Sequence, residues 1–336
     1  MTNRYTRISI SSRVSIFDPG KWGNGHLSVA ISSDFRLIAV RPSISDLSDE
    51  RYEIVYLFSN TGEELSSFDS HGSERGILFW PDDQHLLFGG YDLRSQKITV
   101  IQRSIHSGSL YLPLEHTALD GTSQCIIGGS NNGRYLAGWS TSPNSNTRCW
   151  YYDVVRQTLT DKLELADNAI FSDNDQFAAF THGHNYLPHG DVVCHLLNLE
   201  TGKKLHTIEK AVQTPSQKQD VFLCFASDSS YCLFGHGAEI ALRTLPDLQD
   251  IKTINLDADA FSSGCASTGN EFFALGCING DVYILSADDL RILGRFVSGS
   301  SPSPDVSVHH IQVSKDNRFI GTASQTGVGI YHLEFI

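Results

Sequence analysis

The sequence predicts an all-β fold, a β-propeller of seven four-stranded antiparallel blades, from three observations. A unit of two apolar runs joined by a polar turn, followed by two further strands, recurs seven times in 336 residues. The turns of successive copies lie 41 to 54 residues apart, with a mean of 47, which is the period of a propeller blade. A spare alternating strand precedes the first copy, and the last copy lacks one strand.

The first two strands of each copy are predicted from the turn between them. Asp, Asn and Gly tolerate the left-handed or Asx-turn geometry of a tight reversal. Aligning the seven turns places these residues at one position: Asp34, Asp83, Asn132, Asn174, Asp228, Gly269 and Asp316. The later strands of each copy alternate apolar and polar residues, as in EIVYLF from Glu53 and KITVIQ from Lys97. This alternation indicates half-buried strands.

The predicted blades use nearly the whole chain. They span roughly residues 27–70, 76–116, 123–165, 167–210, 220–257, 260–298 and 307–336. Because the seventh copy stops after its third strand, residues 7–17 are expected to supply its missing outer strand and close the ring, which would protect both sheet edges. A chain of this length ordinarily forms two domains. Seven blades instead predict a single propeller domain over residues 1–336.

At these residues the sequence resembles the WD-repeat propeller family. HLLNLETGKKL (His195 to Leu205) is similar to the third strand, turn and fourth strand of such a repeat, and so is VYLFSNTGEEL. His71 stands twelve residues before Asp83, the spacing between the family's Gly-His histidine and its turn aspartate. No blade carries a Trp-Asp dipeptide, and the other blades lack a histidine at that offset. We therefore do not assign the family's structural Asp-His-Ser-Trp hydrogen-bond tetrad to residues of this chain.

Composition narrows the partners and the compartment. With 25 Lys and Arg against 38 Asp and Glu, the formal net charge is −13, which argues against nucleic acid and anionic membranes as partners. The first residues lack the apolar stretch of a signal peptide, and no run approaches the length of a membrane-spanning helix. The seven cysteines are scattered and form no CxxC pair, as expected of reduced core residues. These features predict a soluble cytoplasmic protein.

The long insertions predict where a partner binds. In the resembled topology they share one face: residues 41–52, 67–76, 115–123, 140–147, 181–191, 209–219 and 297–307. Long loops on a rigid face commonly carry binding, although tolerated drift in loop length gives the same pattern. We therefore expect a noncatalytic scaffold that binds a protein or peptide through this face. The candidate anchors are Arg51, Arg75, Tyr91 and Tyr186. Each of them could equally be an ordinary exposed side chain.

Two loops and one strand carry histidines or acidic residues that are candidates for further binding sites. His182, His184 and His189 lie in one loop of the fourth blade, and imidazole is a good ligand for Zn, Cu or Ni. Zinc ligands usually come from well-secured elements, so the alternative to a metal site is an ordinary polar loop. We expect no cofactor. The loop RPSISDLSDERYE (Arg41 to Glu53) either recognises a basic segment or is simply solvated. His309 and His310 are expected to point one toward the central channel and one into blade packing.

An enzyme or small-ligand binder with its site at the mouth of the central channel is the alternative function, since propellers host several chemistries. The sequence contains no GxxxxGK[ST], HExxH or GxSxG motif, which are signatures of phosphate loops, zinc proteases and nucleophile elbows. No catalytic residue is therefore assigned, and the sequence leaves open whether a reaction is catalysed.

Overall fold

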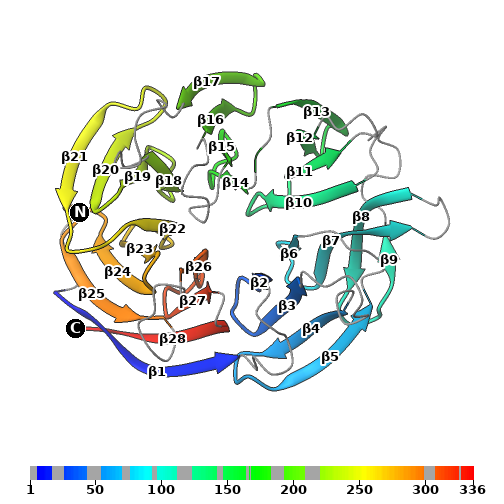
Figure 1. The fold of residues 1–336 in the computed structure, drawn as a ribbon, viewed down its shortest axis with the longest axis horizontal. Helices are drawn as coiled ribbons and strands as arrows, with labels where there is room; N and C mark the ends of the chain where they lie inside the picture. Colours follow the sequence, from blue (N-terminus) through cyan, green and yellow to red (C-terminus); the bar gives the residue numbers. More distant parts are fainter. Residues whose placement is uncertain are drawn as a thin grey trace. The chain divides into compact units, whose positions relative to one another are not determined.

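The structure is a computed structural model that describes residues 6–16, 26–43, 54–69, 76–92, 97–111, 123–141, 147–163, 166, 168–182, 193–208, 220–298, 307–324 and 327–336. The regular elements within these ranges are 28 β-strands, arranged in seven four-stranded antiparallel sheets (Figure 1). The described ranges hold no helix long and apolar enough to cross a bilayer.

The first four sheets follow one another along the chain. Blade 1 contains β2 (His26–Ile31), β3 (Leu37–Ser43), β4 (Ile54–Ser59) and β5 (Glu64–Asp69). Blade 2 contains β6 (Ile77–Phe79), β7 (His85–Asp92), β8 (Lys97–Ser104) and β9 (Leu110–Tyr111). Blade 3 contains β10 (Ser123–Gly129), β11 (Tyr135–Thr141), β12 (Thr147–Asp153) and β13 (Thr158–Leu163). Blade 4 contains β14 (Asn168–Phe171), β15 (Phe177–His182), β16 (Val193–Asn198) and β17 (Lys203–Ile208).

The remaining sheets include the one that combines both ends of the chain. Blade 5 contains β18 (Asp220–Phe225), β19 (Tyr231–His236), β20 (Glu239–Thr244) and β21 (Asp250–Asn255). Blade 6 contains β22 (Phe261–Ala266), β23 (Phe272–Cys277), β24 (Asp281–Ser286) and β25 (Ile292–Val297). Blade 7 contains β26 (His310–Val313), β27 (Phe319–Ser324), β28 (Gly327–Phe335) and β1 (Ile8–Ile16). These sheets confirm the predicted fold class, a seven-bladed β-propeller.

The fourth strand of blade 7 comes from the N-terminus, as the sequence predicts. β1 runs antiparallel to β28, with Ile8 opposite Phe335 and Ile16 opposite Val328. Figure 1 shows the two strands side by side, β1 in blue and β28 in red. The observed strand begins one residue after the predicted segment 7–17 and ends one residue before it.

The chain divides into two compact units, Met1–Asn24 with Ser172–Ile336 and Gly25–Phe171. The predicted single domain stays a prediction. Within each unit, apolar clusters lie between successive blades. In the second unit the alternation of β7 explains this packing, because Leu86 and Phe88 join the cluster with blade 1 while Leu87 joins the cluster with blade 3. Both faces of a middle strand are therefore buried, as continuous apolar runs require.

The first unit packs its blades equally closely. All six residues of β23 are buried, and Phe272 and Ala274 contribute to the cluster between blades 6 and 7. Gly276 is needed at this contact, because a Cβ there would lie 2.6 Å from Cγ1 of Val308. The absence of a side chain thus lets the first strand region of blade 7 approach blade 6.

Candidate functional site

The strand connections differ between the two ends of every sheet. At one end, here called the tight-turn end, the first and second strands of every blade are joined by five residues, and the third and fourth strands of blades 1 to 6 by four or five. At the other end, the variable end, the connections range from two residues between β27 and β28 to twelve between β25 and β26. Ten residues separate β3 from β4 and also β15 from β16. The longest connections therefore all lie at the variable end, as the sequence predicts.

A serine and an Asx residue fix the first turn of most blades. In blade 1 the Ser32 hydroxyl donates to Asp34 Oδ1 at 2.8 Å and accepts the Leu37 N–H, while Asp34 Oδ1 accepts the Arg36 N–H at 3.0 Å. The same arrangement recurs in three further blades with Ser130 and Asn132, Ser172 and Asn174, and Ser314 and Asp316. These side chains satisfy backbone donors that the reversal leaves unpaired.

The sequence alignment of the turns was wrong in blade 2 by one residue. Asp82 Oδ1 accepts the Gln84 N–H at 2.8 Å, which is the role of Asp34 in blade 1. Asp83 has a positive φ of 55°, like Phe35 at 59°. The misalignment arose because this turn begins with Trp80-Pro81 instead of a serine, so two adjacent aspartates competed for the same position. The spacing from His71 to Asp83 therefore no longer supports the WD-repeat resemblance.

The residue at positive φ links neighbouring blades at the tight-turn end. In the second unit, Asp83 Oδ1 accepts the Ser33 N–H at 2.7 Å. In the first unit, Asn270 Oδ1 accepts the Ser227 N–H at 2.6 Å, and Asn317 Oδ1 accepts the Thr268 N–H at 2.9 Å. Each bond joins the first turn of one blade to that of the next. The tight-turn end is thus a fixed scaffold within each unit.

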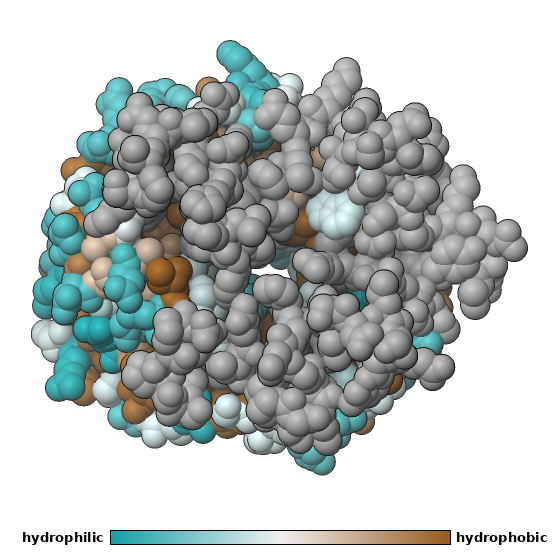
Figure 2. Space-filling model, viewed as in Figure 1, coloured by the Kyte–Doolittle hydropathy of each residue, from teal (hydrophilic) through white to brown (hydrophobic). Residues whose placement is uncertain are grey.

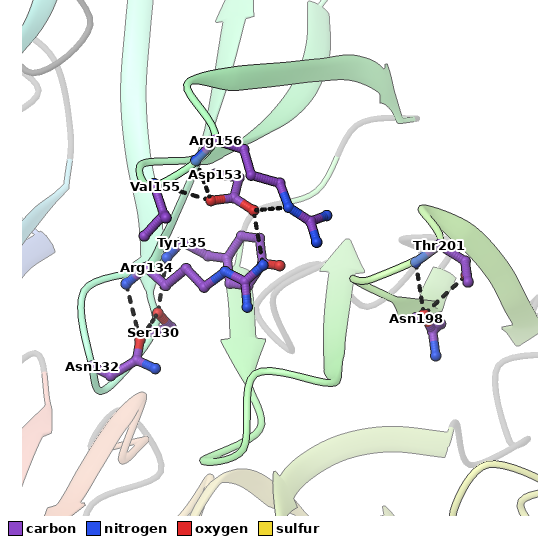
Figure 3. A network of polar contacts seen from close by, with 9 residues as sticks. All are labelled: Ser130, Asn132, Arg134, Tyr135, Asp153, Val155, Arg156, Asn198 and Thr201. Carbon is purple, nitrogen blue, oxygen red and sulfur yellow. Dashed lines mark hydrogen bonds and ion pairs between the residues drawn. The ribbon is translucent and has the colours of Figure 1, made fainter.

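A buried carboxylate organises the tight-turn end of blade 3 (Figure 3). Asp153 is 3% exposed; its Oδ1 accepts the N–H groups of Val155 and Arg156, and its Oδ2 lies 3.2 Å from Arg134 Nη2. Burial raises the pKa of this carboxyl, but the hydrogen bonds and the charge of Arg134 outweigh it, so the pKa lies below its ordinary value.

Asn198 caps a separate turn by accepting from the N–H and hydroxyl of Thr201, at 2.9 Å each.

A groove of about 530 Å³ lies at the tight-turn end in the first unit. It is lined by Glu271, Asp316, Asn317, Arg318, His332, Leu333 and Phe335. These residues come from the β22–β23 turn, the β26–β27 turn and the end of β28. The volume falls within the range of about 300 to 1,000 Å³ typical of ligand pockets. The groove is therefore a candidate binding site made wholly of described residues.

Polar contacts hold the walls of this groove. The Asn317 amide Nδ2 donates to the Thr268 carbonyl at 2.9 Å and to Glu271 Oε2 at 3.2 Å. On the opposite wall, the His332 ring lies 5.0 Å from the Phe319 ring, and its Nδ1 is 2.5 Å from the Ser11 hydroxyl. Because β1, two turns and β28 meet here, the groove is formed before any ligand arrives.

Asp316 places a negative charge at the groove. Burial raises the pKa of its carboxyl, but hydrogen bonds from the Ser314 hydroxyl and the Arg318 N–H, together with the Arg318 charge, outweigh burial. The pKa of Asp316 therefore lies below its ordinary value, and its carboxylate is ionised at neutral pH.

The variable end of blade 6 carries an ion pair between Asp281 and Arg295. Asp281 Oδ2 there accepts from Arg295 Nη2 at 2.7 Å and from Asn279 Nδ2 at 3.0 Å. The Arg295 guanidinium lies 5.0 Å from the centre of the Tyr283 ring. On the face shown in Figure 2, hydrophilic side chains in teal and hydrophobic ones in brown are interspersed over blades 5 and 6. This part of the end combines fixed charge with half-buried apolar residues such as Ala258 and Ile278.

Most residues that the sequence singled out lie outside the described ranges: Arg51, Arg75, Tyr186, His184 and His189. Tyr91 lies in β7 and His182 ends β15, but their side chains are not described. The proposed anchors and the proposed metal ligands are therefore untested. His310 begins β26, and its Nε2 is buried with no hydrogen-bond partner among the described residues.

Sequence reasoning missed the groove because it treated the tight turns as plain reversals. A signal was present in the repeat. The fifth residue of the first turn varies in charge between blades: Arg36, Gln84, Arg134, Gln176, Ser230, Glu271 and Arg318. Consecutive blades 6 and 7 place Glu271 and Arg318 at this position, and both residues line the groove.

Comparison with known proteins adds no assignment, since neither a protein family model nor a curated protein matches the chain. The fold and its connections define the class, a seven-bladed β-propeller with one uniform and one variable end.

Proposed function

We propose that this protein is a noncatalytic scaffold, a divergent WD-repeat-like propeller that binds a protein or peptide partner through the variable end of its blades. The seven-bladed propeller fold commonly mediates protein binding. The observation that carries the proposal is the contrast between the ends: uniform connections of four or five residues at one, and connections of up to twelve residues at the other.

The contrast supports binding because long connections and a rigid base occur on the same blades. Entropy penalises a longer surface loop only weakly, so the variable end tolerates the added length that a binding surface uses. Hydrogen bonds between successive turns restrict the tight-turn end, whereas the connections at the variable end contain up to twelve residues. That combination is typical of binding surfaces.

The cysteines support a cytoplasmic setting for this scaffold. The six cysteines with described side chains are free thiols. Burial raises the pKa of Cys194 to about 12 and that of Cys265 to about 11, so neither is an activated thiolate. A chain that keeps several unpaired thiols in its core suits a reducing compartment.

Affinity capture from the native cell tests the proposal. The loops within residues 44–52 and 183–191 are replaced by short glycine-serine turns, leaving β3, β4, β15 and β16 intact. We expect the loop-shortened protein to lose partners that the intact protein retains. Glu63→Ala with Glu200→Ala changes exposed residues of tight turns and serves as the control. Identical partners for the intact and the loop-shortened, folded protein would rule out these loops as the binding surface.

A further inference from the structure

The groove between blades 6 and 7 carries a charge pattern that selects a ligand. Glu271 and Asp316 contribute two carboxylates and Arg318 one guanidinium, so the fixed charges of the groove are negative on balance. The whole chain has the same sign, with a formal charge of −13. A cationic group is therefore attracted both at long range and at contact.

The groove also offers an apolar surface beside these charges. The Phe335 ring lines it and lies half-buried, 6.1 Å from the Phe272 ring, whereas Leu333 beneath it is only 3% exposed. An aromatic or aliphatic side chain that enters here removes apolar area from water, which favours binding. The ligand that fits thus has a cationic group next to an apolar one.

The walls need little rearrangement to receive such a ligand. Asn317 spans the two turns through its bonds to Thr268 and Glu271, and His332 is held between Phe319 and Ser11. Binding to a preformed site avoids part of the entropy cost of ordering loops.

We propose that this groove binds an extended segment of a partner protein in which a lysine or arginine neighbours an aromatic or large aliphatic residue. The basic side chain lies between Glu271 and Asp316, and the apolar side chain packs on the half-buried ring of Phe335. The site lies at the tight-turn end and goes beyond the proposed function, which concerns the loops of the variable end. A protein with this second site has one binding surface at the variable end and another at the tight-turn end.

Fluorescence anisotropy with a labelled hexapeptide tests the proposal. The probe carries one arginine followed by one phenylalanine in a glycine-serine background; matched peptides replace the arginine by glutamate or the phenylalanine by alanine. We expect the arginine–phenylalanine peptide to bind most tightly. Glu271→Gln and Asp316→Asn each weaken binding about two- to fivefold, as expected for an exposed charge pair. Arg318→Gln strengthens it, because a like charge is removed.

The substitutions are chosen from the protein's own repeats, so they preserve the turns. Gln84 and Gln176 occupy the position of Glu271 and Arg318, and Asn132 occupies that of Asp316. Asp34→Asn makes the same change in the same turn of blade 1 and is the matched control, expected to leave affinity unchanged.

Three results overturn the proposal. One is tighter binding of the glutamate peptide, another is weaker binding after Arg318→Gln, and the third is an equal loss of affinity in the Asp34→Asn control. Measuring the same peptide on the loop-shortened protein keeps the two hypotheses apart, since the residues that line the groove are unchanged in it.

Discussion

Asp153 shows how one buried carboxylate holds a turn together. Its two oxygens accept from two backbone N–H groups and from Arg134, and Arg156 Nε lies 3.8 Å away. In Asp153→Asn the amide oxygen replaces a charged acceptor and the NH₂ group faces the Arg134 guanidinium. We expect a loss of about 2 kcal/mol in the free energy of unfolding, measured by urea denaturation at pH 7.

The control for Asp153 is an exposed aspartate in the first turn of blade 1. Asp34 lies 3.5 Å from Arg36, and both side chains are largely open to water, so Asp34→Asn is expected to cost about 0.5 kcal/mol or less. Because the folded pKa of Asp153 lies below its unfolded value, its contribution is present above about pH 4 and is lost as the pH falls further. Equal losses in the two variants would contradict this account.

His310 makes stability depend on pH in a higher window. Burial lowers the pKa of its imidazole, and a hydrogen bond with Gln312 only partly offsets this. Below about pH 6.5 the unfolded chain binds a proton here that the folded protein does not. The contribution of His310 to the free energy of unfolding is therefore fully present above that pH. It declines as the pH falls, by at most about 1.4 kcal/mol per pH unit.

A comparison of variants isolates this histidine from the others. In urea titrations between pH 5 and 7, His310→Gln should flatten the dependence of the unfolding free energy on pH relative to the unmodified protein. The matched control is His106→Gln, which changes an exposed histidine. The same slope in all three proteins would show that His310 titrates alike in the folded and unfolded chain.

At the scale of the element, the turns between third and fourth strands in blades 2 to 6 share one left-handed position. Glycine occupies it in blades 2 and 4, as Gly108 and Gly202, whereas blade 3 has Gln157 with φ 53° and blades 5 and 6 have Leu248 and Leu290. Gly62 of blade 1 lies one residue earlier in its turn. A residue with a Cβ is strained there by roughly 1–2 kcal/mol, and glycine costs roughly 0.5–1 kcal/mol in backbone entropy. We expect Gln157→Gly to raise the free energy of unfolding by about 0.5 kcal/mol in thermal or urea denaturation.

The neighbouring first turns supply the control for this substitution. Gln176 is also exposed, but its backbone is not left-handed, so Gln176→Gly should destabilise the protein by about 0.5–1 kcal/mol. A loss of stability in Gln157→Gly as large as that in Gln176→Gly would show that the left-handed turn stores no strain.

The elements were largely predictable from the sequence, and the groove was not. Alternation and turn residues define the strands, and the terminal strand was placed within one residue at each end. The turn register failed only where Trp80-Pro81 replaces a serine, because hydrogen bonds and not spacing decide which aspartate caps the turn. The groove combines the turn at Glu271 with that at Arg318 and the end of β28. Side chains so far apart in the chain meet only through blade packing, which no local pattern reports.

At the scale of the whole molecule, β1 protects an edge that the other blades cover with their own fourth strands. It pairs with β28 along its length, and Ile8, 3% exposed, packs in the cluster that contains Phe272 and Leu333. Removing residues 1–16 therefore exposes a long strand edge and part of an apolar cluster. Such edges pair readily with other chains.

We expect the protein without residues 1–16 to melt at a lower temperature and to form oligomers, as followed by calorimetry and size-exclusion chromatography. A synthetic peptide of residues 6–16 should restore the melting temperature in a concentration-dependent way, because it binds the folded edge of β28. The same peptide with Ile8 and Ile16 replaced by serine should fail, since both isoleucines are buried. A truncated protein that stays monomeric and melts like the full chain would show that β28 does not need its N-terminal partner.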